Sequence, residues 1–287
     1  MAVETAPGRT QSVARALRIL KCFTDETPVL RVGDISTRLG LTPSLVSRLL
    51  GTLEHEGMVE RDAETGFFRL GRAVITLAGV SLNANRLRVE ALDDMQEVEN
   101  RLGLGVNLAV LDGDAIFYLA HVDGSRAPRA YTLIGRHNPL HATAMGKLLL
   151  AFLPEEERVG YLACLSLPAY TPHTITDAKH LLDEFERIRR QGWSVELEEL
   201  ALGRGCVAGP IRDMRGDVVA AISISGPIST LAWEHRREEL TRTIIEVADR
   251  ISMRMGYITA TRDGRGGWRP APGFAQGESS AKPKSKQ

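Results

Sequence analysis

The chain has 287 residues, 43% of them hydrophobic and 25% charged, and its 36 basic residues are balanced by 36 acidic ones. This length favours two domains over one core, and no apolar run approaches the roughly 20 residues that span a bilayer. A net charge of zero argues against a strongly basic, non-specific nucleic-acid binder, although a specific DNA-binding protein needs positive charge on one face only.

The first region carries three predicted helices behind a short segment, 1–10, that we expect to be flexible. Apolar side chains recur at helical spacing within 12–23, again within 32–39, and a third time within 42–55. Residues 40–42 alone separate the second helix from the third. Two short helices joined in this way are typical of a helix-turn-helix.

The third predicted helix has two unlike faces. Thr42 is a suitable N-cap, and Pro43 fits the first helical position. One face is an apolar stripe made of Val46, Leu49, Leu50 and Leu53. The other face carries small or polar residues, namely Ser44, Ser47, Arg48 and Gly51. This pattern favours a helix that lies against a DNA major groove over an ordinary amphipathic helix of an all-α core.

A predicted β-hairpin follows the third helix. Residues 58–61 and 67–70 have strand patterns and flank the polar turn 62–66. Three helices and a hairpin make a winged helix-turn-helix, which we place at 11–71 with the wing tip near 63–65. Basic and acidic residues balance over this region. Four arginines could still form one positive face: Arg31, Arg48, Arg61 and Arg69.

The second region is predicted to be an α+β domain at 87–258, reached through a linker helix at 72–86. Its strands are expected at 106–111, 115–122, 129–134, 192–197, 205–212 and 217–225. Its helices are expected at 143–153, 155–163, 177–190 and 229–256. Gly, Pro, Ser, Ala and Lys dominate the end of the chain, so we expect a disordered tail at 261–287.

In this interpretation, DNA contacts come from the third helix, its N-cap, and arginines before and after it. Arg48 suits bidentate hydrogen bonds to guanine, and Gly51 allows close approach. Arg69 on the wing would bind a phosphate, which positions the protein without reading sequence. The predicted DNA-binding residues are Arg31, Thr42, Ser44, Ser47, Arg48 and Arg69.

A second constellation lies in the C-terminal region and suits a small carboxylate ligand. His141-Ala-Thr143 leads into a predicted helix, whose first amide groups could bind an anion. Ser223 and Ser225 alternate on one strand, so both hydroxyls could face one cavity. The alternative is that the serines serve turns and caps and that Gly146 is a packing glycine.

Cys206 has three possible roles: a buried thiol, a wall of a ligand pocket, or a catalytic nucleophile. The other cysteines are Cys22 and Cys164, and this sparse, odd set lacks Cys-x-x-Cys spacing. We therefore expect a protein of the reducing cytoplasm with no zinc site and no cofactor. His141 is more typical of a hydrogen-bonded structural histidine than of a metal ligand.

Both constellations together resemble the IclR (isocitrate-lyase-regulator) family of bacterial transcription regulators. The N-terminal match runs through Ser12-Val-x-Arg15-Ala-Leu-x-Ile-Leu20 and Leu41-Thr-Pro-Ser-x-Val-x-Arg48-Leu-Leu. The C-terminal match includes Pro139-Leu-His-Ala-Thr-Ala-x-Gly146-Lys147, Gly205-Cys206-Val-Ala-x-Pro210 and Ser223-Ile-Ser225-Gly-Pro227. Both signatures occur in the family's order and separation.

The resemblance implies a winged helix-turn-helix, a helical linker and a GAF-like effector domain with an antiparallel sheet and flanking helices. It also implies dimers formed through the N-terminal part and tetramers formed through the effector domains. Glu196 stands where the family commonly has Asp, so a longer acid would reshape the pocket. The effector-binding residues implied are Tyr131, Leu133, Met145, Gly146, Glu196, Cys206, Ser223 and Ser225.

The sequence therefore predicts a cytoplasmic DNA-binding transcription regulator that is not an enzyme. A homodimer or tetramer would bind a pseudo-palindromic operator, under control of a small organic acid in the C-terminal domain, with an aromatic acid as one option. The alternatives are a small-molecule hydrolase that uses Cys206 with His141, or a redox sensor that uses Cys206, each with an accessory helix-turn-helix.

Overall fold

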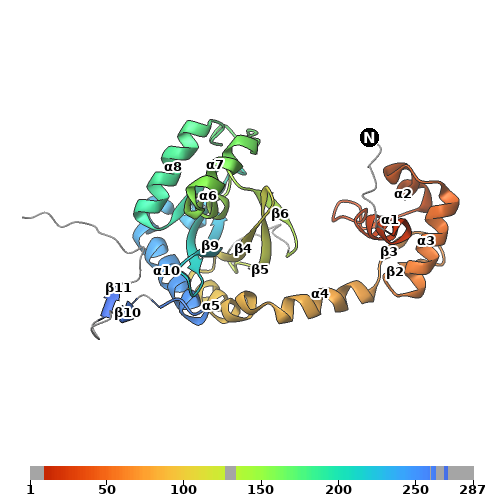
Figure 1. The fold of residues 1–287 in the computed structure, drawn as a ribbon, viewed down its shortest axis with the longest axis horizontal. Coiled ribbons are helices and arrows are strands. Elements are labelled where there is room, and N and C mark those ends of the chain that lie inside the picture. Colours follow the sequence, from red (N-terminus) through yellow and green to blue (C-terminus); the bar gives the residue numbers. More distant parts are fainter. Residues whose placement is uncertain (1–9, 127–133, 259, 263–267, 271–287) are drawn as a thin grey trace, which may run out of the picture. The chain divides into compact units, whose positions relative to one another are not determined.

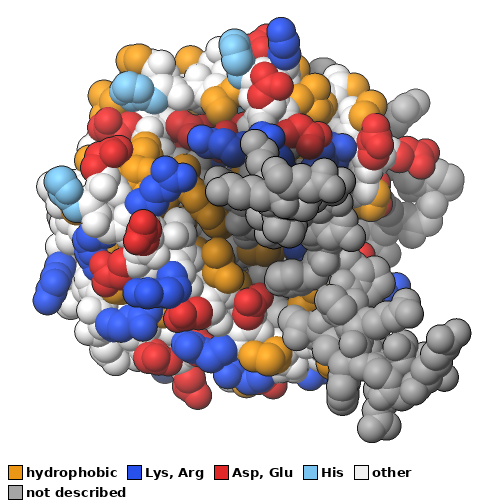
Figure 2. Space-filling model, turned by 90° about the vertical axis from the view of Figure 1, so that its left-hand side faces the viewer, with side chains coloured by type: hydrophobic (Ala, Val, Ile, Leu, Met, Phe, Trp, Pro, Cys, Tyr) orange, Lys and Arg blue, Asp and Glu red, His pale blue; other side chains and the backbone are white. Residues whose placement is uncertain are grey.

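The computed structural model describes residues 10–126, 134–258, 260–262 and 268–270. The chain combines helices and antiparallel sheets in two compact units, Met1–Ala84 and Asn85–Gln287, which are described one at a time. None of the described helices is both long enough and apolar enough to cross a membrane. Figure 2 shows one face of the molecule, on which basic and acidic side chains are interspersed.

The first unit contains helices packed beside a small antiparallel sheet, whose strand order is β1-β3-β2. Its helices are α1 (Gln11–Leu20), α2 (Val32–Leu39), α3 (Pro43–His55) and α4 (Arg72–Ala84). Its strands are β1 (Val29–Leu30), β2 (Val59–Arg61) and β3 (Phe68–Leu70). The strand β1 is too short for a periodic sequence signal, and it was not anticipated.

Local chemistry sets the limits of α2 and α3. Gly40 ends α2 with a φ of 63°, a left-handed conformation that glycine adopts without a Cβ clash. The Thr42 Oγ1 accepts a hydrogen bond from the Leu45 backbone N–H at 3.4 Å, which confirms Thr42 as the N-cap of α3. All four residues of the predicted apolar stripe of α3 are buried. They pack with Ile19 of α1 and Ile35 of α2 in one hydrophobic cluster.

The second unit is built on a six-stranded antiparallel sheet with the order β6-β5-β4-β9-β8-β7. Its strands are β4 (Gly105–Asp112), β5 (Ala115–Val122), β6 (His137–Pro139), β7 (Ser194–Leu197), β8 (Arg204–Arg212) and β9 (Val218–Pro227). Its helices are α5 (Arg86–Leu102), α6 (Ala144–Phe152), α7 (Glu155–Cys164), α8 (Ala178–Gln191), α9 (Ile228–Leu231) and α10 (Trp233–Arg254).

Two hydrophobic cores lie on the two faces of this sheet. The helices α5 and α10 cover one face, where Met95 and Ile244 are fully buried. The helices α6 and α8 cover the other face, where Leu148 and Phe185 are fully buried (Figure 1). Because helices cover both faces of the sheet, side chains in the middle of its strands are shielded from water. A polar side chain there therefore requires a hydrogen-bond partner within the protein.

Several elements differ from the sequence expectations. The predicted helix 229–256 is two helices, because Ala232 takes a φ of 45° between α9 and α10. The strand β6 was missed, and the strand predicted at 129–134 lies almost entirely outside the described residues. The flexible segment predicted at 1–10 lies outside them except for its last residue.

The predicted disordered tail, 261–287, also lies largely outside the described residues. Within it, Ala260–Arg262 (β10) pairs antiparallel with Trp268–Pro270 (β11). A short strand pair in a Gly- and Arg-rich segment has no hydrophobic alternation, so the sequence offered no signal for it.

Candidate functional site

The exposed face of α3 carries the residues that the sequence pattern singled out. Ser44, Ser47, Arg48 and Gly51 are exposed, while the opposite stripe is buried. A Cβ at Gly51 would meet no atom within 4 Å, so this part of the face is open. The Thr42 hydroxyl is exposed but also caps α3. The face is polar, carries one arginine, and can be approached closely.

The other two predicted DNA-binding residues have partners in the structure. The Arg31 guanidinium lies 4.3 Å from the centroid of the Phe67 ring, at the wing. Arg69 donates two hydrogen bonds to Glu60 Oε2 across the β2–β3 hairpin, at 3.2 and 2.9 Å. Arg69 holds the pKa of Glu60 below its usual value. The positive charge of Arg69 is therefore partly neutralised by Glu60 on the neighbouring strand β2.

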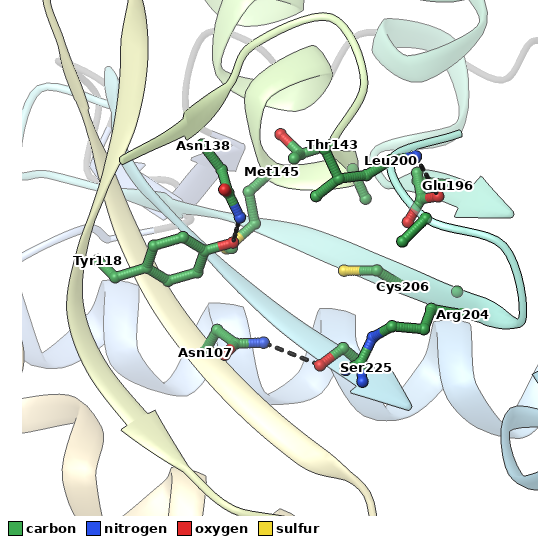
Figure 3. Close-up of a pocket in the computed structure, with 13 residues that line it drawn as sticks. Asn107, Tyr118, Asn138, Thr143, Met145, Glu196, Leu200, Arg204, Cys206 and Ser225 are labelled. Atoms are coloured by element: carbon green, nitrogen blue, oxygen red, sulfur yellow. Dashed lines mark hydrogen bonds between the residues drawn. The ribbon is translucent and has the colours of Figure 1, made fainter. Parts of the chain in front are cut away.

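The central pocket lies between the sheet and the start of α6, and its cavity measures about 70 Å³. Four of the predicted effector residues line it: Met145, Glu196, Cys206 and Ser225. The sequence interpretation missed the others, which are Asn107, Tyr118, Asn138, Thr143, Ala144, Leu200, Ala201, Arg204 and Gly205 (Figure 3). They come from four strands (β4, β5, β6 and β8), from the loop after β7 and from the start of α6.

Asn107 joins the two predicted serines. Its Nδ2 donates to Ser223 Oγ at 3.2 Å and to Ser225 Oγ at 3.0 Å. This contact follows from strand pairing, because Asn107 on β4 is directly opposite Ser223 on β9. Ser225 reaches the central pocket, whereas Ser223 is fully buried and does not line it. Ser223 thus helps to orient Asn107, which in turn donates a hydrogen bond to Ser225 in the pocket lining.

Gly146 does not line the central pocket either, because it is packed against the chain. A Cβ at this position would lie 2.3 Å from the Leu140 carbonyl oxygen and 2.6 Å from Thr143 Oγ1. Its backbone N–H donates to Thr143 Oγ1 at 3.1 Å, which caps α6. The remaining two predicted residues, Tyr131 and Leu133, lie outside the described residues.

Glu196 is a buried acid whose carboxylate holds a loop. Its Oε1 accepts hydrogen bonds from the backbone N–H groups of Glu199, at 2.6 Å, and Leu200, at 3.2 Å. Burial raises the pKa of Glu196 to about 7, although these two hydrogen bonds oppose the rise. The carboxylate therefore shapes the loop 198–203 that closes one side of the central pocket.

A buried ion pair lies beside this loop. Lys147, on α6, is 1% exposed and donates a hydrogen bond to Glu199 Oε1. Glu184 of α8 lies 3.7 Å from the same ammonium group. Burial raises the pKa of Glu199, and the Lys147 charge opposes the rise. A buried cation of this kind is tolerated only while its carboxylate partners remain.

The geometry does not support nucleophilic chemistry at Cys206. Burial raises the pKa of the Cys206 thiol to about 12, which removes the reactive thiolate at neutral pH. His141 lines a separate cavity of about 300 Å³, and its Nε2–H donates to the Pro168 carbonyl at 3.0 Å. No group of metal-binding side chains occurs among the residues that the structure describes.

Comparison with known proteins decides between a DNA-binding transcription regulator and the alternatives of a hydrolase or a redox sensor. Residues 12–63 match the IclR helix-turn-helix domain, and residues 80–253 match the C-terminal domain of the bacterial transcriptional regulator IclR. The chain belongs to the IclR family of bacterial transcriptional regulators. The IclR-type chain is thus a transcriptional regulator with a DNA-binding helix-turn-helix and a separate C-terminal domain, and it is not an enzyme.

Individual IclR relatives agree with this assignment over most of their length. The HTH-type transcriptional regulator XynR of Escherichia coli is 35% identical over 75% of this chain and 85% of XynR. A transcriptional regulator of Rhodococcus sp. RHA1 is 30% identical, with a TM-score of 0.80 over 86% of this chain and 98% of its own. An IclR homolog of Microbacterium hydrocarbonoxydans, solved with 4-hydroxybenzoate, is 28% identical, with a TM-score of 0.77 over 85% and 99% of the two chains.

Proposed function

We propose that this IclR-type regulator binds an operator through the exposed face of α3. The observation that carries the proposal is the exposed polar side of a capped helix in a winged helix-turn-helix. Ser44, Ser47 and Arg48 would face base edges or phosphates in the major groove, with Arg48 reading guanine. Arg31 and Arg69 would contact the backbone, which positions the helix without specifying sequence.

We further propose that two copies bind a pseudo-palindromic operator, with recognition helices about 34 Å or a multiple apart. The helix α4 buries none of its residues, and Ile75 and Val80 are 73% and 65% exposed. On α1, Val13 and Leu17 are also more than half exposed. A second copy would cover these apolar side chains, because such clusters on one unit mark an interaction surface. Pairing of dimers through the C-terminal domains would give a tetramer.

The proposed effector is a small organic acid in the central pocket. The Ser225 hydroxyl and the first amide groups of α6 offer hydrogen-bond donors to a carboxylate, and Asn107 orients that hydroxyl by donating to its oxygen. The homolog that binds 4-hydroxybenzoate supports an acid as the class of ligand. The cavity of about 70 Å³ is less than half the roughly 150 Å³ that holds benzene. A compact aliphatic acid therefore fits this cavity better than an aromatic one.

Binding would change operator affinity only if the effector prefers one of two arrangements of the molecule. Couplings of this type are typically worth about 1–3 kcal/mol. The helix α4 precedes Asn85 and therefore joins the two units along the chain. We assign to it the role of transmitting the change.

One experiment tests operator and effector together. Wild-type protein selects its binding site from random-sequence DNA, and thermal denaturation is then followed with a panel of aliphatic and aromatic carboxylates. A binding acid raises the melting temperature, because it stabilises the folded state by about 2.7 kcal/mol at 100 times its Kd. The same acid should alter affinity for the selected DNA. Failure to select any DNA sequence would contradict the operator proposal.

Ser225→Ala and Ser223→Ala form a matched pair for the effector site. Ser225 lines the central pocket, whereas Ser223 lies behind it and shares the same Asn107 partner. Ser225→Ala is expected to weaken acid binding more than Ser223→Ala. Equal binding to wild type and to Ser225→Ala would place the carboxylate site elsewhere.

A further inference from the structure

Among the residues that the structure describes, Arg204 is the one cation that lines the central pocket. It begins β8 and is half-buried. Its backbone is fixed, because its carbonyl accepts a hydrogen bond from the Glu198 N–H at 2.8 Å. Its guanidinium makes no hydrogen bond or ion pair with the residues that the structure describes. A half-buried guanidinium that lines a pocket and has no described anionic partner is available to an anionic ligand.

Glu196, the one acid among the described lining residues, does not neutralise Arg204. The Glu196 carboxylate accepts hydrogen bonds from two loop amides and is directed toward Leu200 (Figure 3). Burial raises the pKa of Glu196 to about 7, so a large fraction of this acid is uncharged at neutral pH. The remaining polar groups of the lining are neutral side chains, such as Asn107 and Ser225. The described lining therefore presents the positive charge of Arg204, which an anionic ligand can balance.

The positive charge of Arg204 is separated from the start of α6. Figure 3 shows Thr143 and Met145 on one side of the central pocket and Arg204 on the other, with Cys206 between them. The first amide groups of α6 have no acceptors within their own helix, and they carry the positive end of the helix dipole. The central pocket thus offers donors to an anion at two separated places.

We propose that Arg204 binds a second anionic group of the effector, so that the effector is a short dicarboxylate. This inference rests on the proposed function, which assigns one carboxylate to Ser225 and the start of α6. The planar guanidinium can donate two parallel hydrogen bonds to the other carboxylate. Binding would complete the missing ion pair of Arg204, whereas a monocarboxylate held at α6 would leave that charge uncompensated.

The test compares diacids with their monoamides, which keep the shape and remove one charge. Malonate and malonamate, then succinate and succinamate, are titrated by calorimetry into wild type and Arg204→Gln. Wild type should bind one diacid at least 10-fold more tightly than its monoamide. Arg204→Gln should lower diacid affinity at least 10-fold and change monoamide affinity less than 3-fold. Arg204→Lys should restore part of the preference.

Arg215→Gln is the matched control, because Arg215 is exposed in the turn between β8 and β9 and lies outside the pocket lining. It should leave both affinities unchanged. Equal loss of both ligands in Arg204→Gln would show that Arg204 holds a single carboxylate, and no loss would show that it holds none. Either result overturns the dicarboxylate inference while leaving an acid-binding pocket. Failure of every carboxylate to bind wild type would overturn the proposed effector class and this inference together.

Discussion

The exposed face of α3 and the central pocket differ in how their polar groups are bound to the rest of the protein. On α3, the side chains of Ser47 and Arg48 extend into solvent from a helix whose other side forms the core. In the central pocket, Glu196 and Asn107 are buried and hydrogen-bonded to the surrounding chain. DNA contacts can therefore change with little effect on folding, whereas the pocket is coupled to the stability of its domain.

The largest expected effect is at Lys147. Lys147→Met removes the only cation that the described structure pairs with the buried Glu199 carboxylate, while Glu184 keeps its ion pair with Arg187 at 2.6 Å. Removing one partner of a buried ion pair typically costs about 3–5 kcal/mol, so the free energy of unfolding should fall by that amount in urea titrations. The control is Lys179→Met on α8, an exposed residue that should change stability by less than about 0.5 kcal/mol. Equal stabilities of the two variants would show that the pair does not support the fold.

The second effect is a pH dependence that arises from Glu196. The folded protein holds this proton more tightly than the unfolded chain, because burial raises the pKa from 4.5 to about 7. The resulting stability is complete below pH 4.5 and is lost as the pH rises through 7. The loss amounts to about 3 kcal/mol. Glu199, whose pKa is also raised by burial, acts in the same direction.

Glu196→Gln tests this linkage. Between pH 5 and 8, its unfolding free energy should fall by less than that of wild type, as measured by urea titration at each pH. Glu246→Gln on α10 is the control, because Glu246 is exposed and outside the central pocket. A Glu196→Gln variant with the pH profile of wild type would remove Glu196 as the source.

Arg48→Ala should separate DNA affinity from stability. Loss of one bidentate base contact costs about 1–3 kcal/mol, or roughly 5- to 150-fold in operator affinity. Stability should change by less than about 0.5 kcal/mol, since Arg48 is exposed. Fluorescence anisotropy with the selected DNA measures the first quantity, and Arg215→Ala provides the same charge change in the other unit. Unchanged anisotropy curves for Arg48→Ala would exclude Arg48 from the interface.

The smallest expected effect is a gain of DNA affinity. Glu60→Gln releases Arg69 from its cross-strand ion pair, so the arginine becomes available to a phosphate. One further phosphate contact should steepen the dependence of log affinity on log salt concentration by about 1. Glu64→Gln at the wing tip removes the same charge without releasing an arginine. If both variants had the same salt slope, Arg69 would not contact the phosphate backbone.

The sequence predicted the local geometry well, and the long-range partners poorly. The buried stripe of α3 and its N-cap follow from spacing within a few residues, so Val46, Leu49 and Thr42 were predictable. Asn107 was not, because its contact with Ser225 depends on the pairing of β4 with β9 across more than 100 residues. Periodicity describes which face a residue occupies, but not which strand is its neighbour.

Arg204 was missed for a related reason. Its position depends on the turn after β7, where Glu198 takes a φ of 62° and its carboxylate accepts a hydrogen bond from the Gly203 N–H at 2.6 Å. A non-glycine residue in the left-handed region is rare, and no sequence pattern marks it. Gly146 was predicted to bind the effector, with a packing glycine as the alternative, and in the structure it packs against Leu140 and does not line the pocket.

The tight packing of Gly146 has a consequence for how ligand specificity can diverge. Any side chain at this position would collide with the Leu140 backbone, so position 146 is closed to substitution and the start of α6 is held in place. Leu200, Ala201 and Arg204 line the pocket from on and beside a surface loop, where new side chains can be accommodated. A mutagenesis library that aims for a new effector should therefore leave 140–147 intact and vary these three positions.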